Sequence, residues 1–239
     1  RLESEMRRQE KLAAIGTLAA GVAHEIRNPL SSIKGYATYF KQKFPENSED
    51  SEAADVMLNE ANRLNRVISD LLSLSAQGSL KLKPIDLTAV ANHVLRLLRQ
   101  NAKSRKITIE TKFAARIPLV MADMEKISQA LLNICLNAFD AMGEGGTLTV
   151  AISGGKNRVC LLARDTGSGI PPEIMEKIFD PYFTTKGSGT GLGLPMTHKI
   201  VREHNGEIDA TSRVGTAGTD GETIFKIWLP AAPRGDRQD

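Results

Sequence analysis

The sequence has no apolar run near the ~18 residues that a membrane-spanning helix needs, and no signal-peptide pattern. It has only two cysteines, Cys135 and Cys160, both in apolar surroundings, which favours buried, reduced thiols over a disulfide framework. Aromatic residues make up 5%, and the basic residues are dispersed. These shortages exclude a nucleic-acid surface with stacking platforms and predict a chain without membrane contact of its own.

What remains is ordinary for a globular protein: 239 residues, 41% hydrophobic and 25% charged, with a formal net charge of +3. The length suffices for one large or two small domains. The sequence starts abruptly in a helical pattern, without an initiator methionine. We therefore expect a fragment of a longer protein.

Two amphipathic helices are predicted in the first third of the chain. From Leu12 to Phe40, apolar residues recur mostly every three or four positions, and the pattern ends near Phe44 and Pro45. A polar stretch, PENSED, then precedes a second stripe from Val56 to Leu72. The two helices would form an antiparallel hairpin. Because two helices alone cannot bury both stripes, we expect a homodimeric four-helix bundle.

The pattern changes near residues 76–84, where Gly78 and SLKLKP mark a boundary and Asp86 is placed to cap a new helix. Helical patterns follow over 88–101, 123–142 and 191–204, and strand patterns over KITIETKF, TLTVAIS, RVCLLARD, GEIDATS and ETIFKIWLP. This order predicts an α/β sandwich without βαβ repeats. The predicted domains are 1–76, a linker 77–84, 85–232 and a tail 233–239.

The stretch AHEIRNPL contains a histidine that the helical period places opposite the apolar stripe. His24 should therefore face solvent, with Asn28 on the same side and Pro29 kinking the helix just beyond it. An exposed imidazole is largely neutral at pH 7 and nucleophilic at one nitrogen, and the carboxylate of Glu25 could hold the proton of the other. A solvated helix face is the alternative explanation, and a nucleophile would still need an electrophile.

The helix over 123–142 has an apolar stripe that includes Cys135 and Met142, with Asn133, Asn137 and Asp140 on the opposite face. Asparagine is a poor helix former, and two amide oxygens at i and i+4 suit Mg²⁺ shared with phosphate. Simple solvation of this face is the alternative.

Two glycine-bearing stretches point to a nucleotide. In DTGSGIPPE, Asp165 ends a predicted strand and could accept a hydrogen bond from the exocyclic amine of adenine, while Gly167 and Gly169 allow close backbone approach. In KGSGTGLGLPM, glycines precede a helix whose N-terminus favours phosphate. The strand that a dinucleotide-binding fingerprint requires is missing before them, so that interpretation is rejected.

Together these stretches resemble the sensor histidine kinases. AHEIRNPL resembles the phospho-acceptor box, LLNICLNAFDAM the N box, DTGSGIPPE the G1 box, FDPYFTTK the F box and GTGLGLPM the G2 box. Within this family the chain most resembles the nitrogen-regulation and zinc-responsive envelope-stress sensors, the latter especially. The resemblance implies a helical hairpin followed by an ATP-binding sandwich of the gyrase, Hsp90 and histidine-kinase type.

The resemblance also implies roles. His24 would be the phospho-acceptor, Glu25 the general base, and Asn28 the residue that orients water for dephosphorylating the partner. Asn137 would bind Mg²⁺ with Asn133 assisting, and Asp165 with Gly167 and Gly169 would read adenine. The remaining ATP-binding positions would be Phe183, Lys186, Gly189, Thr190, Gly191, Leu192 and Gly193. For the last glycine motif the choice among Gly215, Gly218 and Gly221 stays open.

The predicted activity is ATP-dependent phosphorylation of His24, followed by transfer to an aspartate of a response-regulator receiver domain. The resemblance implies a regulator acting with sigma-54, and a full-length protein anchored in the bacterial inner membrane with this portion in the cytoplasm. The alternatives are a clamp ATPase of the gyrase or Hsp90 kind, which would need an acid where Ala130 stands, and a non-enzymatic dimerising module. A phosphatase activity on the partner is compatible with the kinase.

The remaining three histidines have other expected roles. His93 is expected to be structural or solvated, and His204 is expected to cap the end of its helix. His198 follows the glycine turn by roughly one helical turn, and its role stays open between contacting the phosphates and a structural one. No cysteine and histidine spacing indicates a zinc site.

Overall fold

The computed structural model describes residues 26–45, 48–75, 80–155, 157–186, 189–215 and 221–233. His24 and Glu25 lie outside the described residues. The chain divides into two compact units, the first made of Arg1–Gly78 with Thr185–Leu192 and the second of Ser79–Thr184 with Gly193–Asp239.

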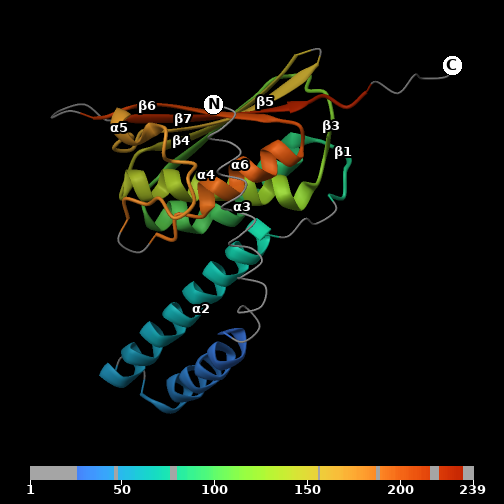
Figure 1. The fold of residues 1–239 in the computed structure, drawn as a ribbon. Helices are drawn as coiled ribbons and strands as arrows, with labels where there is room; N and C mark the ends of the chain where they lie inside the picture. Colours follow the sequence, from blue (N-terminus) through green and yellow to red (C-terminus); the bar gives the residue numbers. More distant parts are fainter. Residues whose placement is uncertain are drawn as a thin grey trace. The chain divides into compact units, whose positions relative to one another are not determined.

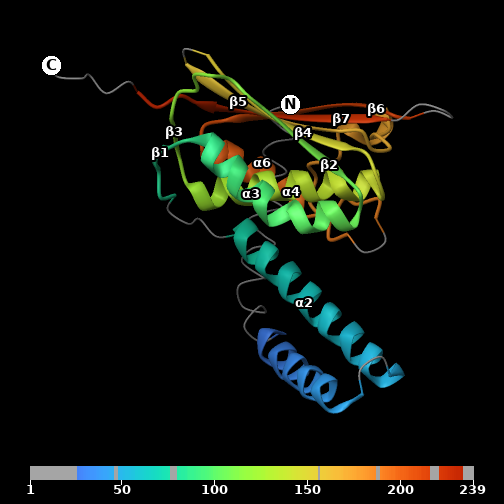
Figure 2. The same cartoon turned by 180° about the vertical axis from the view of Figure 1, so that it is seen from behind.

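The first unit contains the predicted helical hairpin. A helix over 26–43 and helix α2 (Glu49–Ser75) lie side by side, as both views show (Figures 1 and 2). Leu30 of the first helix is buried in one cluster with Ala61 and Ile68 of α2. An ion pair between Lys41 and Asp55 also joins the two helices. The predicted hairpin is thus confirmed.

The polar turn between the helices is made by its own side chains. The Ser48 hydroxyl oxygen accepts a hydrogen bond from the Ser51 N–H at 3.2 Å and thereby caps α2. The hydroxyl itself donates to the Pro45 carbonyl at 2.8 Å. Glu49, Asp50 and Glu52 lie in the first turn of α2, where negative charge is stabilised by the helix dipole. Ser48, Glu49 and Asp50 of the stretch PENSED therefore favour the start of α2.

The second unit is a two-layer sandwich whose main sheet has the strand order β2-β4-β5-β7-β6. Only β2 and β4 pair in parallel; the other neighbours are antiparallel. The strands of this sheet are β2 (Thr108–Phe113), β4 (Thr147–Gly154), β5 (Arg158–Asp165), β6 (Glu207–Arg213) and β7 (Glu222–Pro230). The predicted strands over RVCLLARD and ETIFKIWLP coincide with β5 and β7.

Three helices cover one face of this sheet (Figure 1). They are α3 (Leu87–Ser104), α4 (Met124–Met142) and α6 (Gly193–Glu203). α4 packs against both of the others. Asp86 caps α3, as predicted, by accepting from the Thr88 N–H at 2.8 Å. The buried sides of α4 and β5 meet in the core, so the face of α4 and the end of β5 that carry the predicted site residues are held on one rigid scaffold.

Three short elements were not predicted. They are β1 (Lys83–Ile85), β3 (Val120–Ala122) and the helix α5 (Pro172–Met175). β1 and β3 form a separate two-stranded antiparallel sheet. Three-residue strands are too short to show the alternation on which strand prediction depends.

The burial of Cys160 differs from the prediction. Cys135 on α4 is fully buried, whereas Cys160 on β5 is only half-buried. Along β5 the alternate residues Val159, Leu161 and Ala163 point to the helices and are buried. Cys160 therefore lies on the face of the sheet opposite α3, α4 and α6. Met142, which was placed in the apolar stripe of α4, is likewise half-buried, and Phe139 fills the core instead.

Candidate nucleotide-binding site

Asp165 is the most deeply buried carboxylate of the predicted site. It is the last residue of β5, is 3% exposed, and accepts a hydrogen bond from the Gly167 N–H at 2.9 Å. Burial raises the pKa of this carboxyl to about 6 despite that hydrogen bond, and the nearby Glu222 carboxylate adds to the rise. A buried acceptor that is held in place and poorly solvated is suited to bind a hydrogen-bond donor from a ligand.

The loop after Asp165 is held against α4 by backbone contacts. The Ser168 N–H donates to the carbonyl of Ala141 at 3.1 Å. A Cβ on Gly167 would lie 2.8 Å from the Ala141 backbone, so no larger residue fits there. Gly169 has a φ of +79°, and a Cβ on it would lie 2.2 Å from the Arg213 carbonyl oxygen. In the structure the two glycines allow close approach to the backbone of Ala141 and Arg213; the predicted approach to a ligand stays a prediction.

Gly221 closes the other side of the same loop. A Cβ on Gly221 would lie 2.5 Å from the carbonyl oxygens of both Gly167 and Ser168. Gly215 contacts the loop through its own N–H, which donates to the Ser168 carbonyl at 3.1 Å. Gly218 lies outside the described residues. At Gly221, therefore, a side chain would collide with the backbone of this loop.

Two hydroxyl residues beside Asp165 were not identified from the sequence. Thr223 lies directly opposite Asp165 in the β5–β7 pairing and is 3% exposed. Its hydroxyl is 2.9 Å from that of Ser212, which donates to the Glu222 carbonyl at 2.7 Å and accepts from the Ile170 N–H at 2.8 Å. Ser212 thus uses its one proton on Glu222, so Thr223 donates to Ser212. The strand alternation of ETIFKIWLP already places Thr223 on the buried face and could have indicated it.

The two asparagines of α4 lie half-buried on the face opposite the core. The Asn133 amide donates to the carbonyl of Gly193, the first residue of α6, at 3.2 Å. The side-chain oxygen of Asn133 takes no part in that hydrogen bond. Asp140, the third polar residue of the predicted cluster, instead pairs with Arg105 at 3.1 Å. The predicted ligands on this face of α4 are the two amides, and Asp140 was not among them.

The amide oxygens of Asn133 and Asn137 are the candidate ligands for a magnesium ion. Among the described residues, no group of three or more His, Cys, Asp or Glu could hold a metal ion. Neutral amide oxygens are hard ligands that leave a cation's charge for phosphate oxygens. The donor set of Asn133 and Asn137 therefore fits Mg²⁺ shared with a nucleotide.

The glycine turn before α6 contains a residue in the left-handed conformation. Gly191 has a φ of +64°, and the Thr190 hydroxyl accepts from the Leu192 N–H at 3.3 Å. Leu192 is fully buried. α6 then begins at Gly193, whose carbonyl also accepts from the Thr197 hydroxyl at 2.9 Å.

The loop before the glycine turn is divided between the two units, with the boundary between Thr184 and Thr185. Phe183, in the second unit, is half-buried, and its N–H donates to the Asp180 carbonyl at 3.2 Å. Lys186 belongs to the first unit with Gly189, Thr190, Gly191 and Leu192, and its side chain is exposed.

The first described turn of the hairpin shows the residues that follow His24. Asn28 is exposed, as predicted, and the helix runs through Pro29. The hydroxyls of Ser31 and Ser32 donate back to the carbonyls of Arg27 and Asn28, at 2.8 and 3.4 Å. The predicted kink falls at the edge of the described residues.

The other histidines divide into three environments. His93 is exposed on α3, as predicted. The His198 ring packs against Phe179, with centroids 5.4 Å apart. His204 caps the end of α6, as predicted, because its ring lies 2.7 Å from the carbonyl oxygen of Ile200 in the last turn. Asn205, with a φ of +54°, then ends the helix.

His204 also links two helices in the core. It is 3% exposed; Nε2 accepts from the Asp123 N–H at 2.9 Å, and Nδ1 lies 2.7 Å from the Ile200 carbonyl oxygen. Because Nε2 accepts, the ring carries its proton on Nδ1 and donates to Ile200. Its role is to fix the end of α6 to the start of α4.

Among the described residues, no helix is both long and apolar enough to cross a bilayer. The buried acceptor at the end of a strand, the loop of close-approach glycines and the amide-bearing helix define a nucleotide-binding two-layer sandwich, here following a helical hairpin.

Comparison with known proteins agrees with both parts. Residues 14–79 match the family model of the His Kinase A (phospho-acceptor) domain. Residues 122–233 match that of the histidine kinase-, DNA gyrase B- and HSP90-like ATPases. Sensor histidine kinase ZraS of Escherichia coli K12 is 46% identical over 229 residues, covering 96% of this chain and 48% of the relative. The chain thus spans about half the length of this curated relative.

Solved structures of histidine kinases are also similar to this chain. The catalytic domain of histidine kinase ThkA is 30% identical with a TM-score of 0.57, covering 64% of this chain and 99% of that chain. ThkA in complex with the response regulator TrrA is 30% identical with a TM-score of 0.68, covering 97% of this chain and 66% of that chain. Full-length ShkA in complex with AMPPNP shares the fold, with a TM-score of 0.76 at 24% identity, over 91% of this chain and 47% of that chain. The chain belongs to the sensor histidine kinase family.

Proposed function

We propose that this chain is the kinase portion of a sensor histidine kinase, which moves the γ-phosphoryl group of ATP to His24 and then to an aspartate of a receiver domain. In this proposal, residues 1–76 dimerise and carry the phosphoryl group, residues 77–84 link the domains, and residues 85–232 bind ATP. The buried Asp165 carboxylate, held by the Gly167 N–H beside the close-approach glycines, is the observation that carries the proposal.

Asp165 would read the base. One of its oxygens already accepts from Gly167, and the other can accept from the amino group of adenine. Guanine presents a carbonyl at the corresponding position, which repels a carboxylate. Thr223, opposite Asp165 in the β5–β7 pairing, would add a second polar group beside the base. The site would therefore prefer ATP to GTP.

The phosphates would lie at the glycine turn and the start of α6. Backbone N–H groups at a helix N-terminus are not used within the helix and attract phosphate. Lys186 would contribute a positive charge, with Gly189, Thr190, Gly191, Leu192 and Gly193 forming the turn. Asn137, assisted by Asn133, would hold Mg²⁺, which supplies neutralisation of the phosphate charge when bound.

His24 would act as the nucleophile and Glu25 as the base. A neutral imidazole nitrogen attacks the γ-phosphorus in line; a P–N bond forms as the bond to the leaving ADP oxygen breaks. The Glu25 carboxylate accepts the proton from the other ring nitrogen, so that the ring is neutral again after transfer. The receiver aspartate then attacks the same phosphorus and releases the histidine. Positioning and charge neutralisation provide most of the rate enhancement.

The partners follow from the hairpin. Ile33, Tyr36 and Phe40 are 46%, 65% and 42% exposed in the single chain, on one stripe of the first helix. A second copy would cover this stripe and complete a four-helix bundle. The receiver domain of a response regulator would dock on that bundle, and ThkA was crystallised with such a regulator. We assign the regulator to the sigma-54-dependent activators and the chain to the cytoplasmic portion of an inner-membrane protein by resemblance.

The clamp ATPase alternative is less well supported. It requires a water-activating acid on α4, and the position at which the related ATPases place one is Ala130, a fully buried methyl group. The exposed Asn28, four residues after His24, supports a phosphatase activity on the partner in addition to the kinase. Replacing Asn28 by alanine should then raise the phosphorylated fraction of the regulator.

Calorimetric titration of ATP, GTP and ADP against the chain and its D165N variant tests the nucleotide site. In the variant the only amide oxygen is taken by Gly167, and an NH₂ group meets the adenine amino group. We expect ATP to bind at least about 30-fold more weakly, about 2 kcal/mol. The matched control is D209N, at an exposed carboxyl on β6. Equal binding of GTP and ATP, or an unchanged D165N, would refute the assignment.

A further inference from the structure

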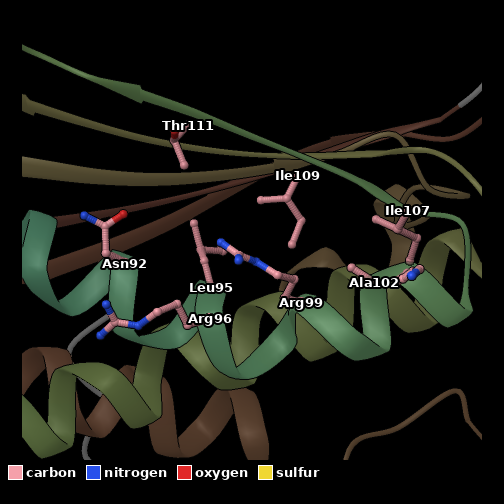
Figure 3. Close-up of a pocket in the computed structure, with 9 residues that line it drawn as sticks. Asn92, Leu95, Arg96, Arg99, Ala102, Ile107, Ile109 and Thr111 are labelled. Carbon is pink, nitrogen blue, oxygen red and sulfur yellow. The ribbon is translucent and has the colours of Figure 1, made fainter.

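A groove runs between α3 and the edge strand β2, on the side of α3 away from α6. Its volume is about 690 Å³. The floor is apolar, formed by Leu95, Ala102, Ile107 and Ile109. Figure 3 shows these side chains between the helix and the strand, with Arg99 lying across the space between them. The groove shares no residue with the nucleotide site, which lies along α4 and the start of α6.

β2 leaves half of its backbone groups without a strand partner. It is the first strand in the order β2-β4-β5-β7-β6 and pairs only with β4. In this parallel pairing the N–H groups of Thr108 and Ala114 donate to β4, to the Gly146 and Ile152 carbonyls, both at 2.9 Å. Residues two apart along a strand point their N–H and C=O groups to the same side. The N–H and C=O groups of Ile109, Thr111 and Phe113 therefore point to the open edge.

The same strand alternation brings side chains of β2 into the groove. Ile109 and Thr111 pair with Leu148 and Val150 of β4, which are buried under the helices. Their side chains thus point to the helical layer, and both line the groove. A further strand added beside β2 would project every second side chain into this groove, beneath α3.

The wall formed by α3 is positively charged. Arg96, Arg99 and Lys103 line the groove, and no acidic residue does. In the part of the chain that the structure describes, none of the three has an ion pair. Their neighbours differ: Arg105 pairs with Asp140 at 3.1 Å and Lys106 with Glu144 at 3.5 Å.

We propose that this groove binds an extended acidic peptide segment of a partner protein by strand addition to β2. The peptide backbone pairs with Ile109, Thr111 and Phe113. Its inward side chains alternate between apolar groups that cover the floor and carboxylates that meet Arg96, Arg99 and Lys103. Main-chain hydrogen bonds supply affinity, and the three cations supply selectivity for acidic sequences. This binding is independent of the function proposed for the nucleotide site.

The test uses fluorescein-labelled octapeptides and fluorescence anisotropy with the full chain. The probe is Val-Ser-Glu-Ser-Val-Ser-Glu-Ser, in which the side chains on one face of the extended strand alternate between valine and glutamate. One comparison peptide has lysine in place of glutamate, and a second has the same charge as the probe but a central proline that blocks strand pairing. We expect the probe to bind, more weakly as salt is raised, and both comparison peptides to bind at least about tenfold more weakly.

Charge reversal locates the site. The double variant R96E/R99E should weaken probe binding at least about tenfold, whereas R116E, at an exposed arginine outside the groove, should leave it unchanged. ATP binding by both variants shows that they are folded.

Hydrogen exchange followed by NMR gives the residue-level readout. Without peptide, the amides of Ile109, Thr111 and Phe113 should exchange faster than those of Glu110 and Lys112, which point to β4. With saturating probe the three edge amides should become protected. Equal binding of the proline peptide, equal binding by R96E/R99E, or absence of edge protection would each overturn the proposal. An oligo(dT) that binds as tightly without edge protection would do the same and indicate a nonspecific polyanion surface.

Discussion

The carboxyl of Asp165 stores unfavourable energy in the nucleotide-free protein. Burial raises its pKa to about 6 from an ordinary value of 3.8. Folding therefore favours the protonated form, so the stability contributed by this group is complete below pH 4 and is lost as the pH rises through 6. A ligand that donates a hydrogen bond to the carboxylate compensates for this loss. A loss of folding stability in the nucleotide-free protein that a ligand can reverse is typical of a residue in a binding site.

The D165N variant should accordingly stabilise the nucleotide-free chain at pH 7.5, by about 2 kcal/mol in the free energy of unfolding. Urea denaturation at pH 4.5 and at 7.5 measures this. The advantage of the variant should be small at pH 4.5, where Asp165 is already protonated in the folded state. The exposed control D209N should show no such difference, and an advantage of D165N that is equal at both pH values would contradict the account.

Gly221 is the second residue whose role can be tested alone. In G221A the new Cβ would lie 2.5 Å from the carbonyl oxygens of Gly167 and Ser168 and must displace the loop after Asp165. We expect ATP affinity to fall at least about tenfold, with a loss of about 1–3 kcal/mol in stability. G155A is the control, because its Cβ would make an ordinary contact of 3.5 Å. Unchanged nucleotide affinity in G221A would show that the loop tolerates movement there.

Single site residues could be predicted from the sequence where their role depends on their immediate neighbours in the chain. Asp165 could be predicted because a carboxylate at the end of an apolar strand, followed by glycines, has a restricted set of uses. Gly221 could not be distinguished from Gly215 and Gly218, since only the fold brings β7 against the loop after β5. Thr223 belongs to no glycine motif, and only its position on the buried face of β7 marks it.

Hydrogen bonds to the Asp123 carboxylate anchor the N-terminus of helix α4. Asp123 caps it by accepting from the Glu125 and Lys126 N–H groups, and it also accepts from the Lys81 N–H at 3.0 Å. Burial alone would raise the pKa of Asp123, but these hydrogen bonds hold it below the ordinary value. Its stabilising contribution is therefore present above pH 4 and is lost as the pH falls below that value.

His204 connects this cap to the end of α6, so the variant H204F removes a cross-link between two helices. It leaves the buried Asp123 N–H without an acceptor, which should cost about 1–3 kcal/mol in the free energy of unfolding. H93F, at an exposed histidine on α3, should change stability by about 0.5 kcal/mol or less. Chemical denaturation of the two variants at neutral pH measures the difference. Equal stability of the two would refute the cross-link.

Element types were predictable to the extent that each element shows its own period. The 27-residue α2 and the eight- and nine-residue strands β5 and β7 have enough residues for a clear pattern. β1 and β3 have three residues each, and the proline in KPI argues against a strand. The parallel pairing of β2 with β4 also could not be predicted, because pairing depends on contacts between residues far apart in the chain.

For the whole molecule, the exposed stripe of the hairpin predicts self-association. Leu30 and Ala37 are buried within one chain, whereas Ile33 and Tyr36 beside them are 46% and 65% exposed. I33E should convert a dimer into a monomer in sedimentation equilibrium, because a buried charge would be left unpaired at the interface. T38E, on the opposite side of the same helix, should remain dimeric. A monomeric wild type, or a dimeric I33E, would contradict the four-helix bundle.

The central claim is that His24 receives a phosphoryl group from ATP. The most direct measurement is incubation of the chain and its H24Q variant with γ-labelled ATP and Mg²⁺, followed by acid or alkali treatment of the labelled protein. The account predicts label that is stable in alkali, labile in acid and absent from H24Q, while the variant still binds ATP and dimerises. Label that survives in H24Q, or no label on a wild-type chain that binds ATP, would contradict it and favour the clamp ATPase.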